Sequence, residues 1–295
     1  MLSARRERVL ITGIRGFTGR YMAAEMRSAG YQVFGLGGGE HGQQLDLTDG
    51  AALEKFVAEL QPEIVIHLAG LAFVGHGDAN NFYQVNLLGT RNLLAALATC
   101  AKAPEAVLLA SSANVYGNAS SGMLDEATPP APANDYAVSK LAMEYMARMW
   151  MEQLPLIIVR PFNYTGIGQA EDFVLAKIVA HFRCQAPDIA LGNLDVWRDF
   201  GDVRVLVKIY RRLIEARALG VTVNVGSGNT HSLREVVAVC EQITGHRMQI
   251  RVVPAFVRVN EVKSLCADVG LLRRLIGDWT IPALEQTLRW MLEAE

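Results

Sequence analysis

Cysteine, net charge and long apolar runs are all scarce in this sequence of 295 residues. The four cysteines are widely spaced and form no CxxC pair, so neither a zinc site nor a disulfide framework is indicated and no metal site is expected. The formal net charge is only -2 and no basic stripe occurs, which excludes nucleic acid as the expected partner. Because no run of about 18 apolar residues is present, we expect no membrane association and a cytoplasmic protein.

Strand and helix patterns alternate over the first 160 residues, which predicts a Rossmann-type α/β fold with a doubly wound parallel sheet. Strands are expected at 9–12, 31–36, 63–69, 106–111 and 156–160, and helices at 18–29, 49–60, 80–101 and 136–153. We expect an NAD(P)-binding domain over 1–160, completed by about 203–226. Residues 161–295 then form mainly a smaller, interleaved α/β domain for the substrate, with Asp172, Asp202 and Ser232 as helix N-caps.

Three glycines follow the first strand directly, at Gly13, Gly16 and Gly19. Glycine permits a tight turn, close approach to a pyrophosphate and close packing of helix on strand, with the phosphates at the helix N-terminus. The sequence therefore predicts a dinucleotide site. The second strand ends in glycines 37–39 where an NAD site has an acidic residue, and Arg15 can offer positive charge to a 2′-phosphate, so NADP(H) is favoured over NAD(H).

The helix expected at 80–101 carries apolar residues nearly all round, so it needs a burial partner besides the sheet. A homodimer through helices 80–101 and 135–153 is the simplest prediction. His67 stands alone on an apolar strand and is interpreted as a hydrogen-bonded core residue, not as a catalyst.

Tyr136 and Lys140 are four residues apart, so they share one face of the predicted helix at about 5 to 6 Å between Cβ atoms. A lysine ammonium beside a phenol, with an oxidised nicotinamide nearby, would lower the tyrosine pKa toward neutrality. The phenol could then exchange a proton with a carbonyl or carbinol while hydride moves to or from the coenzyme. Ser112 ends a strand where ligands of such sheets gather, and can bind the same oxygen.

Several motifs together resemble the extended short-chain dehydrogenase/reductase family: the glycine turn, the HLAG strand end, VNLLGT around Asn86, SSANVYG, the Tyr136/Lys140 pair and RPFN from Arg160. The resemblance covers essentially the whole chain and implies Ser112, Tyr136 and Lys140 as the catalytic residues. It also implies a set of coenzyme contacts, namely Gly13, Arg15, Gly16, Phe17, Gly19, Asp46, Leu47, Leu68, Ala69, Gly70, Asn86, Tyr136, Lys140 and Pro161.

The second half resembles the members of that family that act on GDP-linked sugars, which implies a GDP-sugar as the small-molecule partner. A nucleoside diphosphate needs cations, and Lys177, Arg198 and Arg258 can supply them. The residues implied as substrate contacts are Asn114, Asn163, Val174, Lys177, Leu191, Gly192, Asn193, Arg198, Arg258 and Glu261.

The reaction class depends on Ala113 and Asn114. A sugar 4,6-dehydratase needs an additional carboxyl group beside the tyrosine, and neither residue can exchange a proton at neutral pH. The prediction is NAD(P)H-dependent reduction of the 4-keto group of a GDP-6-deoxy-4-keto-hexose, giving GDP-D-rhamnose from GDP-4-dehydro-6-deoxy-D-mannose. Alternatives are a nucleotide-sugar 4-epimerase with bound NAD, a GDP-mannose 4,6-dehydratase, and a non-catalytic NADP sensor, which would have no need of Ser112, Tyr136 and Lys140.

Overall fold

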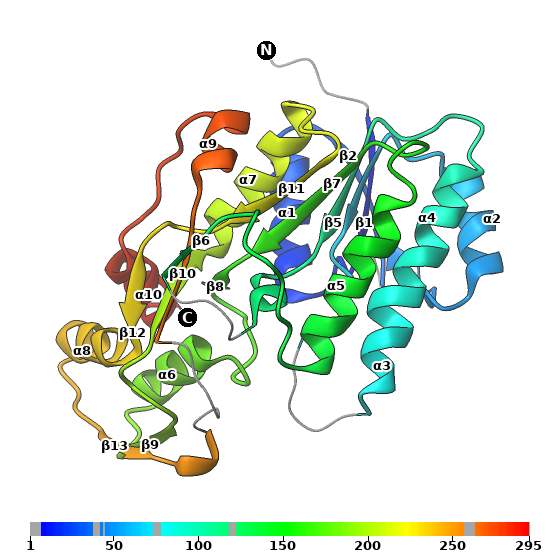
Figure 1. Ribbon diagram of the computed structural model, residues 1–295. Coiled ribbons are helices and arrows are strands. Elements are labelled where there is room, and N and C mark those ends of the chain that lie inside the picture. Colours follow the sequence, from blue (N-terminus) through cyan, green and yellow to red (C-terminus); the bar gives the residue numbers. More distant parts are fainter. Residues whose placement is uncertain are drawn as a thin grey trace.

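The computed structural model describes residues 7–37, 42–43, 45–72, 78–117, 122–256 and 263–294. It has two parts (Figure 1). The larger is a parallel sheet with helices on both faces, and the smaller is built around α6 (Val174–Arg183), α8 (Leu233–Thr244) and α10 (Leu284–Leu292). No helix in the described ranges is long and apolar enough to cross a bilayer.

The large sheet has seven strands in the order β11-β7-β5-β4-β1-β2-β3, and all neighbouring pairs are parallel. The strand order reverses between β1 and β4, which makes their carboxyl ends the expected ligand site. The predicted doubly wound sheet is therefore confirmed. Its strands are β1 (Arg8–Thr12), β2 (Gln32–Leu36), β3 (Gly42–Gln43), β4 (Ile64–His67), β5 (Ala106–Ala110), β7 (Leu156–Pro161) and β11 (Val221–Val225).

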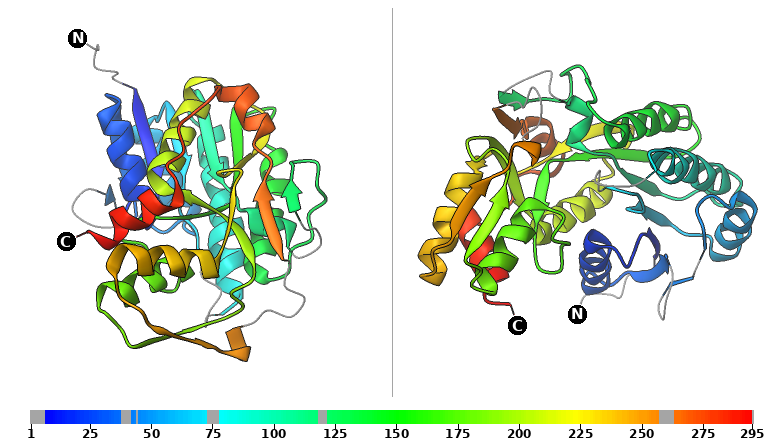
Figure 2. Two further views of the ribbon diagram at one scale, coloured as in Figure 1. Left: turned by 90° about the vertical axis from the view of Figure 1, so that its left-hand side faces the viewer. Right: turned by 90° about the horizontal axis from the view of Figure 1, so that it is seen from below.

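Alternate residues of the strands supply two hydrophobic cores, one on each face of the sheet. Val9 and Ile11 pack with α1 (Phe17–Ser28), α7 (Val203–Glu215) and α9 (Gly270–Ile276). Leu10, between them, packs on the opposite face with α2 (Gly50–Leu60), α4 (Thr90–Ala98) and α5 (Asp135–Arg148). Figure 2, seen from below, shows α1 on one side of the sheet and α4 and α5 on the other.

The helix expected at 80–101 is a continuous rod whose middle turn has π geometry. It consists of α3 (Asn80–Phe82), the π-helix η1 (Tyr83–Gly89) and α4. The wider turn sets the side chain of Asn86 inward, where it is fully buried. Single π turns inside α-helices are frequent at functional sites.

The smaller part contains a second sheet in the order β12-β10-β14-β6, with β8 paired to β10, and a two-stranded sheet of β9 and β13. Its core lies under α6, α8 and α10. Asp202 and Ser232 cap α7 and α8 as predicted, whereas Asp172 does not cap α6, which begins after Phe173 without a side-chain cap. The strands are β6 (Gly122–Leu124), β8 (Asn163–Thr165), β9 (Asp188–Leu191), β10 (Trp197–Asp202), β12 (Thr230–Ser232), β13 (Gln249–Val252) and β14 (Ser264–Ala267), and two 3-10 turns are η2 (Ala113–Tyr116) and η3 (Pro254–Phe256).

Candidate functional site

The glycine turn joins β1 to α1 as the sequence predicts. Gly13 has a positive φ of 69°, and a Cβ there would lie 2.8 Å from the backbone nitrogen of Ala69. Gly16 is the N-cap of α1 and provides no side-chain cap, and the first helical turn contains no acidic residue. The N–H groups at this helix start are thus available to an anion, so the turn fits the pyrophosphate of a dinucleotide.

Gly19 is where the turn has least room. A Cβ at this position would lie 2.1 Å from the carbonyl oxygen of Gly13, which is backbone and cannot move aside. We expect Gly19→Ala to weaken coenzyme binding by about tenfold or more and to lower the melting temperature, measured by fluorescence titration and thermal unfolding. Gly50→Ala is the control, because its Cβ would lie 3.5 Å from the nearest atom, a side-chain carbon of Asn92. Equal behaviour of the two variants would contradict this prediction.

The end of β2 lies against the glycine turn. The N–H of Gly13 donates to the carbonyl of Leu36 at 2.9 Å, and Gly37 has a φ of 135°. Arg15 is exposed within the turn. The end of β2 therefore presents only backbone at the place where an NAD site has an acidic side chain. Gly38 and Gly39 lie outside the described residues.

The strand end of β4 forms the opposite wall. Leu68 and Ala69 donate their N–H groups to the carbonyl and hydroxyl of Thr12, at 3.2 Å each. Next along the chain, a Cβ on Gly70 would lie 3.1 Å from Nζ of Lys140 and 2.9 Å from Oδ1 of Asn86. The absent side chain thus lets the lysine approach the strand end.

His67 is a core residue, as predicted. It is 1% exposed, its ring nitrogens contact the hydroxyls of Thr12 and Thr90 at 2.7 and 2.8 Å, and burial lowers its pKa to about 3, with Lys140 a smaller cause. Thr90 donates to the carbonyl of Asn86, whose side chain in turn binds Leu71 and Ser139. This neutral buried chain joins β1, β4, η1 and α5.

Ser112, Tyr136 and Lys140 come from two elements that meet at the carboxyl edge of the sheet. Ser112 follows β5, and its hydroxyl lies close enough to Tyr136 to lower the pKa of that phenol. Asn134 caps α5 by accepting from the N–H of Ala137, which fixes the start of the helix that carries Tyr136. Lys140, one turn later, donates from Nζ to the carbonyl of Ala110 at 2.8 Å. Tyr136 and Lys140 are only 7% and 6% exposed.

The pKa of Tyr136 lies above its usual value. Burial raises it to about 12 because the phenolate loses its hydration, and the nearby Ser112 hydroxyl offsets only part of this. The fall toward neutrality is predicted with an oxidised nicotinamide nearby, so it stays a prediction for the coenzyme-bound protein. Tyr136 is protonated at neutral pH, which suits a proton donor.

Lys140 gives the site a pH dependence. Burial lowers its pKa to about 8, against the opposing charge of Glu144, so its ammonium is charged below pH 8 and neutral above it. We expect kcat/KM to fall above about pH 8, since this parameter reports ionisations of the free enzyme. In Lys140→Arg, whose guanidinium stays protonated, the residual activity should lack this limb. A wild-type profile that is flat from pH 7 to 9.5 would contradict the prediction.

Beneath the site lies a buried ion pair that the sequence did not reveal. Arg160 binds Glu144 through two hydrogen bonds, of 2.9 and 2.6 Å, and both side chains are almost fully buried. Ser111 donates to the same carboxylate at 2.6 Å, and the remaining arm of Arg160 donates to Tyr116 at 2.9 Å. Glu144 lies one turn after Lys140 on α5. The regular spacing of Tyr136, Lys140 and Glu144 could have indicated from the sequence that Glu144 lies near the site.

The other expected coenzyme contacts lie near the same edge, with differing exposure. Asp46 is exposed and accepts from the N–H of Thr48, a bond that lowers the pKa of its carboxyl. Leu47 and Pro161 are buried. Phe17 starts α1 and stacks on Tyr164 at 6.0 Å between ring centroids.

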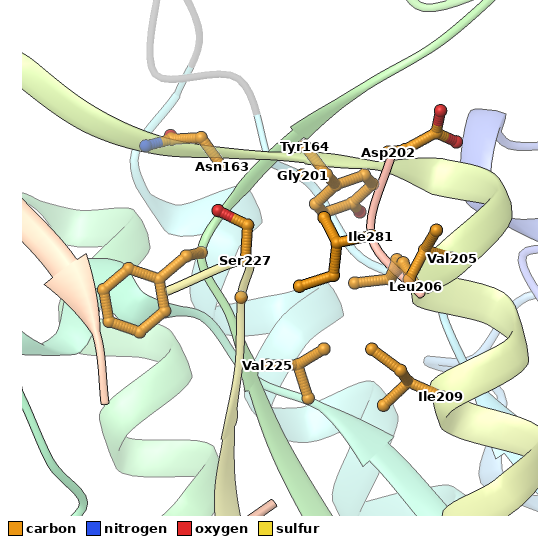
Figure 3. Close-up of a pocket in the computed structure, with 12 residues that line it drawn as sticks. Asn163, Tyr164, Gly201, Asp202, Val205, Leu206, Ile209, Val225, Ser227 and Ile281 are labelled. Atoms are coloured by element: carbon orange, nitrogen blue, oxygen red, sulfur yellow. The ribbon is translucent and has the colours of Figure 1, made fainter. Parts of the chain in front are cut away.

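Two of the expected substrate contacts carry exposed amide side chains. Asn114 stands in η2, where its N–H donates to the Ser112 hydroxyl, and Asn163 opens β8. Figure 3 shows Asn163 at the rim of a small, mostly apolar pocket that contains neither Ser112 nor Tyr136. Ser227 also lines this pocket.

A second group of expected contacts gathers at α6 and β9. Lys177 donates to the carbonyl of Ala190 at 2.8 Å and lies 5.3 Å from the ring centroid of Phe256, an exposed aromatic residue that the sequence did not single out. A Cβ on Gly192 would lie 2.6 Å from the carbonyl oxygen of Phe256. Lysine, backbone and aromatic ring thus converge on one surface.

The remaining expected substrate contacts have other surroundings. Leu191 is buried in the small core and Val174 packs against it, while Asn193 accepts from the N–H of Asp195 in a turn. Arg198 lies within β10 and donates to the carbonyl of Trp197. Arg258 and Glu261 lie outside the described residues. Among the described residues, no group of three or more His, Cys, Asp or Glu side chains could hold a metal ion.

Two curated relatives match nearly the full chain. GDP-6-deoxy-D-talose 4-dehydrogenase of Aggregatibacter actinomycetemcomitans is 32% identical over 274 residues, covering 92% of each chain. GDP-6-deoxy-D-mannose reductase of Pseudomonas aeruginosa is 33% identical over 297 residues, covering 97% of this chain and 96% of the relative.

Two solved structures have a closely similar fold. A candidate epimerase from Burkholderia cenocepacia J2315 is 48% identical, with a TM-score of 0.93 over 99% of this chain and 98% of its own. RMD from Pseudomonas aeruginosa, solved with NADPH, is 32% identical, with a TM-score of 0.86 over 97% and 96%.

The sequence family described as the NAD dependent epimerase/dehydratase family matches residues 9–226. This range runs from the first residues of β1 through the last strand of the large sheet, and so includes the glycine turn, Ser112, Tyr136 and Lys140. The chain belongs to the NAD dependent epimerase/dehydratase family, whose members are NAD(P)-dependent enzymes acting on nucleotide sugars.

Proposed function

We propose that this protein reduces the 4-keto group of a GDP-6-deoxy-4-keto-hexose with NADPH, converting GDP-4-dehydro-6-deoxy-D-mannose into GDP-D-rhamnose. The placement of the Ser112 hydroxyl beside the buried, protonated phenol of Tyr136 carries the proposal, because two hydroxyl groups can then bind one substrate oxygen. Both curated relatives are named for GDP-6-deoxyhexoses, which supports the nucleotide and the deoxygenated sugar.

The chemistry requires one hydride and one proton. The reduced coenzyme, when bound, supplies hydride to C4 of the sugar. Tyr136 donates its phenolic proton to the C4 oxygen, so the carbonyl becomes a carbinol, and the Ser112 hydroxyl hydrogen-bonds to that oxygen as charge develops on it. The Lys140 ammonium stabilises the phenolate left on Tyr136, and solvent returns the proton afterwards.

The choice of NADPH rests on the backbone around the end of β2. Gln32–Leu36 and Gly37 contain no carboxylate that would repel a 2′-phosphate, and Arg15 is exposed in the adjacent glycine turn. An Arg guanidinium suits phosphate oxygens. The structure with NADPH among the relatives agrees with this choice.

Ala113 and Asn114 support reduction over dehydration. Both occupy η2 next to Ser112, where a dehydratase would need a carboxyl group to protonate the departing C6 hydroxyl. The second candidate is a nucleotide-sugar 4-epimerase with bound NAD, which the 48% identical epimerase candidate favours. An epimerase would manage with the same Ser112, Tyr136 and Lys140.

A substrate panel tests the proposal. Purified protein is mixed with NADPH or NADH and the 4-keto-6-deoxy forms of GDP-, UDP- and dTDP-sugars, and coenzyme oxidation is followed at its absorbance band. We expect oxidation with the GDP-sugar and NADPH above all. Interconversion of nucleotide hexoses without added coenzyme would instead establish the epimerase, and no coenzyme oxidation with any 4-keto sugar would overturn the proposal.

We also propose that the protein is a homodimer through η1, α4 and α5. Three apolar side chains lie exposed on α5 and its C-cap, Val138, Tyr145 and Met149, at 38%, 57% and 72%, and Leu88 on η1 is 41% exposed. A patch of this kind marks an interaction surface. We expect the wild type to have twice the mass of the 32.3 kDa chain by light scattering, and Met149→Glu to shift it toward monomer. A wild-type monomer at micromolar concentration would contradict this.

A further inference from the structure

Three hydrogen bonds hold the segment after β7 against the first turns of α1. The phenol of Tyr164 and the hydroxyl of Thr18 lie 2.8 Å apart. One turn further along α1, Tyr21 donates to the carbonyl of Ile167 at 2.8 Å, and Arg20 donates to that of Gly168 at 3.0 Å. The segment that opens the smaller part therefore lies on the helix whose N-terminus faces the expected pyrophosphate.

Tyr164 is held on its ring as well as on its hydroxyl. Its ring is nearly parallel to that of Phe17, with 12° between the planes. Figure 3 shows Tyr164 among the residues that line the small pocket. Since successive side chains of a strand point to opposite faces, β8 presents Asn163 to one side and Tyr164 to the other. The same strand thus faces the substrate side and the coenzyme side.

Tyr164 is also close to the candidate acid. Burial is the largest cause of the raised pKa of Tyr136. The nearby Ser112 hydroxyl lowers this pKa, and Tyr164 raises it. Tyr210 of α7 is close to both phenols. Burial is the largest cause of its raised pKa, and Tyr164 and Tyr136 raise that pKa further. The phenol of Tyr164 therefore contacts Thr18 in the first turn of α1 and also lies close enough to Tyr136 to raise its pKa.

We propose that Tyr164 and Thr18 form a positioning pair that fixes the first turn of α1 against the smaller part, so that the coenzyme pyrophosphate binds to a preformed helix start. The proposal rests on the proposed function only in taking the glycine turn as the coenzyme site. When the helix start is already held in its bound geometry, less conformational entropy is lost as the coenzyme binds. Affinity for the coenzyme then rises without a new contact.

The test is titration with NADPH and with NADH, followed by fluorescence of the bound coenzyme, in the absence of any sugar nucleotide. Tyr164→Phe keeps the stack on Phe17 and deletes the hydroxyl, and Thr18→Val deletes its partner. We expect each to raise the coenzyme Kd about tenfold, and the double variant to be no weaker than either, because the two hydroxyls act as one unit. Thr18→Ser keeps the hydroxyl and should therefore bind the coenzyme with wild-type affinity.

Tyr21→Phe is the matched control, since it deletes a phenol that ties the same segment to the same helix one turn away. We expect its coenzyme Kd to stay within about twofold of wild type even if its melting temperature falls. The proposal is overturned if Tyr164→Phe binds as wild type does, or if Tyr21→Phe weakens binding equally. If the wild-type protein binds coenzyme but reduces no 4-keto sugar, the proposed function is excluded. The titration still tests the positioning pair in that case.

Discussion

Replacing Tyr136 with phenylalanine is expected to lower kcat for 4-keto reduction by about 10³-fold, because the variant keeps the buried ring and loses the proton donor. Coenzyme affinity should change little, since the glycine turn and Lys140 remain. Stopped-flow or steady-state oxidation of the coenzyme measures the first quantity, and fluorescence titration measures the second. A variant that retains a tenth of the activity would show that another group delivers the proton.

The control for this variant is Tyr145→Phe. Tyr145 lies on the same helix but is 57% exposed, so its hydroxyl contributes nothing to the buried site. Its kcat should match that of the wild type. Ser112→Ala gives a graded comparison, because it leaves the phenol in place and removes only the second hydroxyl at the substrate oxygen. Its loss should be smaller than that of Tyr136→Phe.

Replacing Glu144 with glutamine is expected to lower the free energy of unfolding by about 3–5 kcal/mol. The change leaves the guanidinium of Arg160 buried without its counterion, and it replaces one of the two carboxylate oxygens that accept from Arg160 and Ser111 with an NH2 donor. Urea denaturation with a two-state fit measures the loss. A neutral result would mean that Tyr116 and water alone can stabilise the arginine.

The matched control is Glu285→Gln, which breaks an ion pair of the same chemistry with Arg289 at the surface. Its partners are 57% and 47% exposed, so the expected loss is less than about 1 kcal/mol. Glu144→Gln has a second readout, because the charge of Glu144 opposes the effect of burial on the pKa of Lys140. The high-pH limb of kcat/KM should move below pH 8 in this variant and stay in place in the control.

The large sheet and its ligand edge could be predicted because the signals there are local. An apolar strand, a glycine turn and a helix start follow one another within Val9–Gly19, and no distant residue is needed to interpret them. The N-cap residues Asp202 and Ser232 each accept a hydrogen bond from a backbone N–H only a few residues later in the chain. Both caps were predicted correctly. The failed cap at Asp172 shows that a suitable residue type alone does not fix where a helix begins.

The small sheet could not be predicted because tertiary contacts stabilise it. In β10 the sequence WRDFGD has no strand alternation, yet Asp199 is fully buried and accepts hydrogen bonds from Ser227, Gly228 and Ala267. These partners follow β11 or lie in β14, at least 28 residues away along the chain. The π turn of η1 is likewise absent from the periodicity, which fits an ordinary helix.

The placement of Ser112, Tyr136 and Lys140 could be predicted from the sequence more easily than the electrostatics around them. Spacing alone placed Tyr136 and Lys140 on one helix face, and the structure brings Ser112 to them. The direction of the tyrosine pKa depends on burial, which arises only when α5 packs on the sheet. Tyr164, Phe256 and the pair of Glu144 with Arg160 also depend on packing between distant segments.

Isotope transfer from coenzyme to sugar is the most direct test of hydride transfer at this site. The protein is given GDP-4-dehydro-6-deoxy-D-mannose and reduced coenzyme deuterated at one face of nicotinamide C4, each face in a separate reaction, and the product is examined by NMR and mass spectrometry. We predict one deuterium at C4 of the sugar from one of the two labelled coenzymes. Product formation without deuterium from either coenzyme would contradict it.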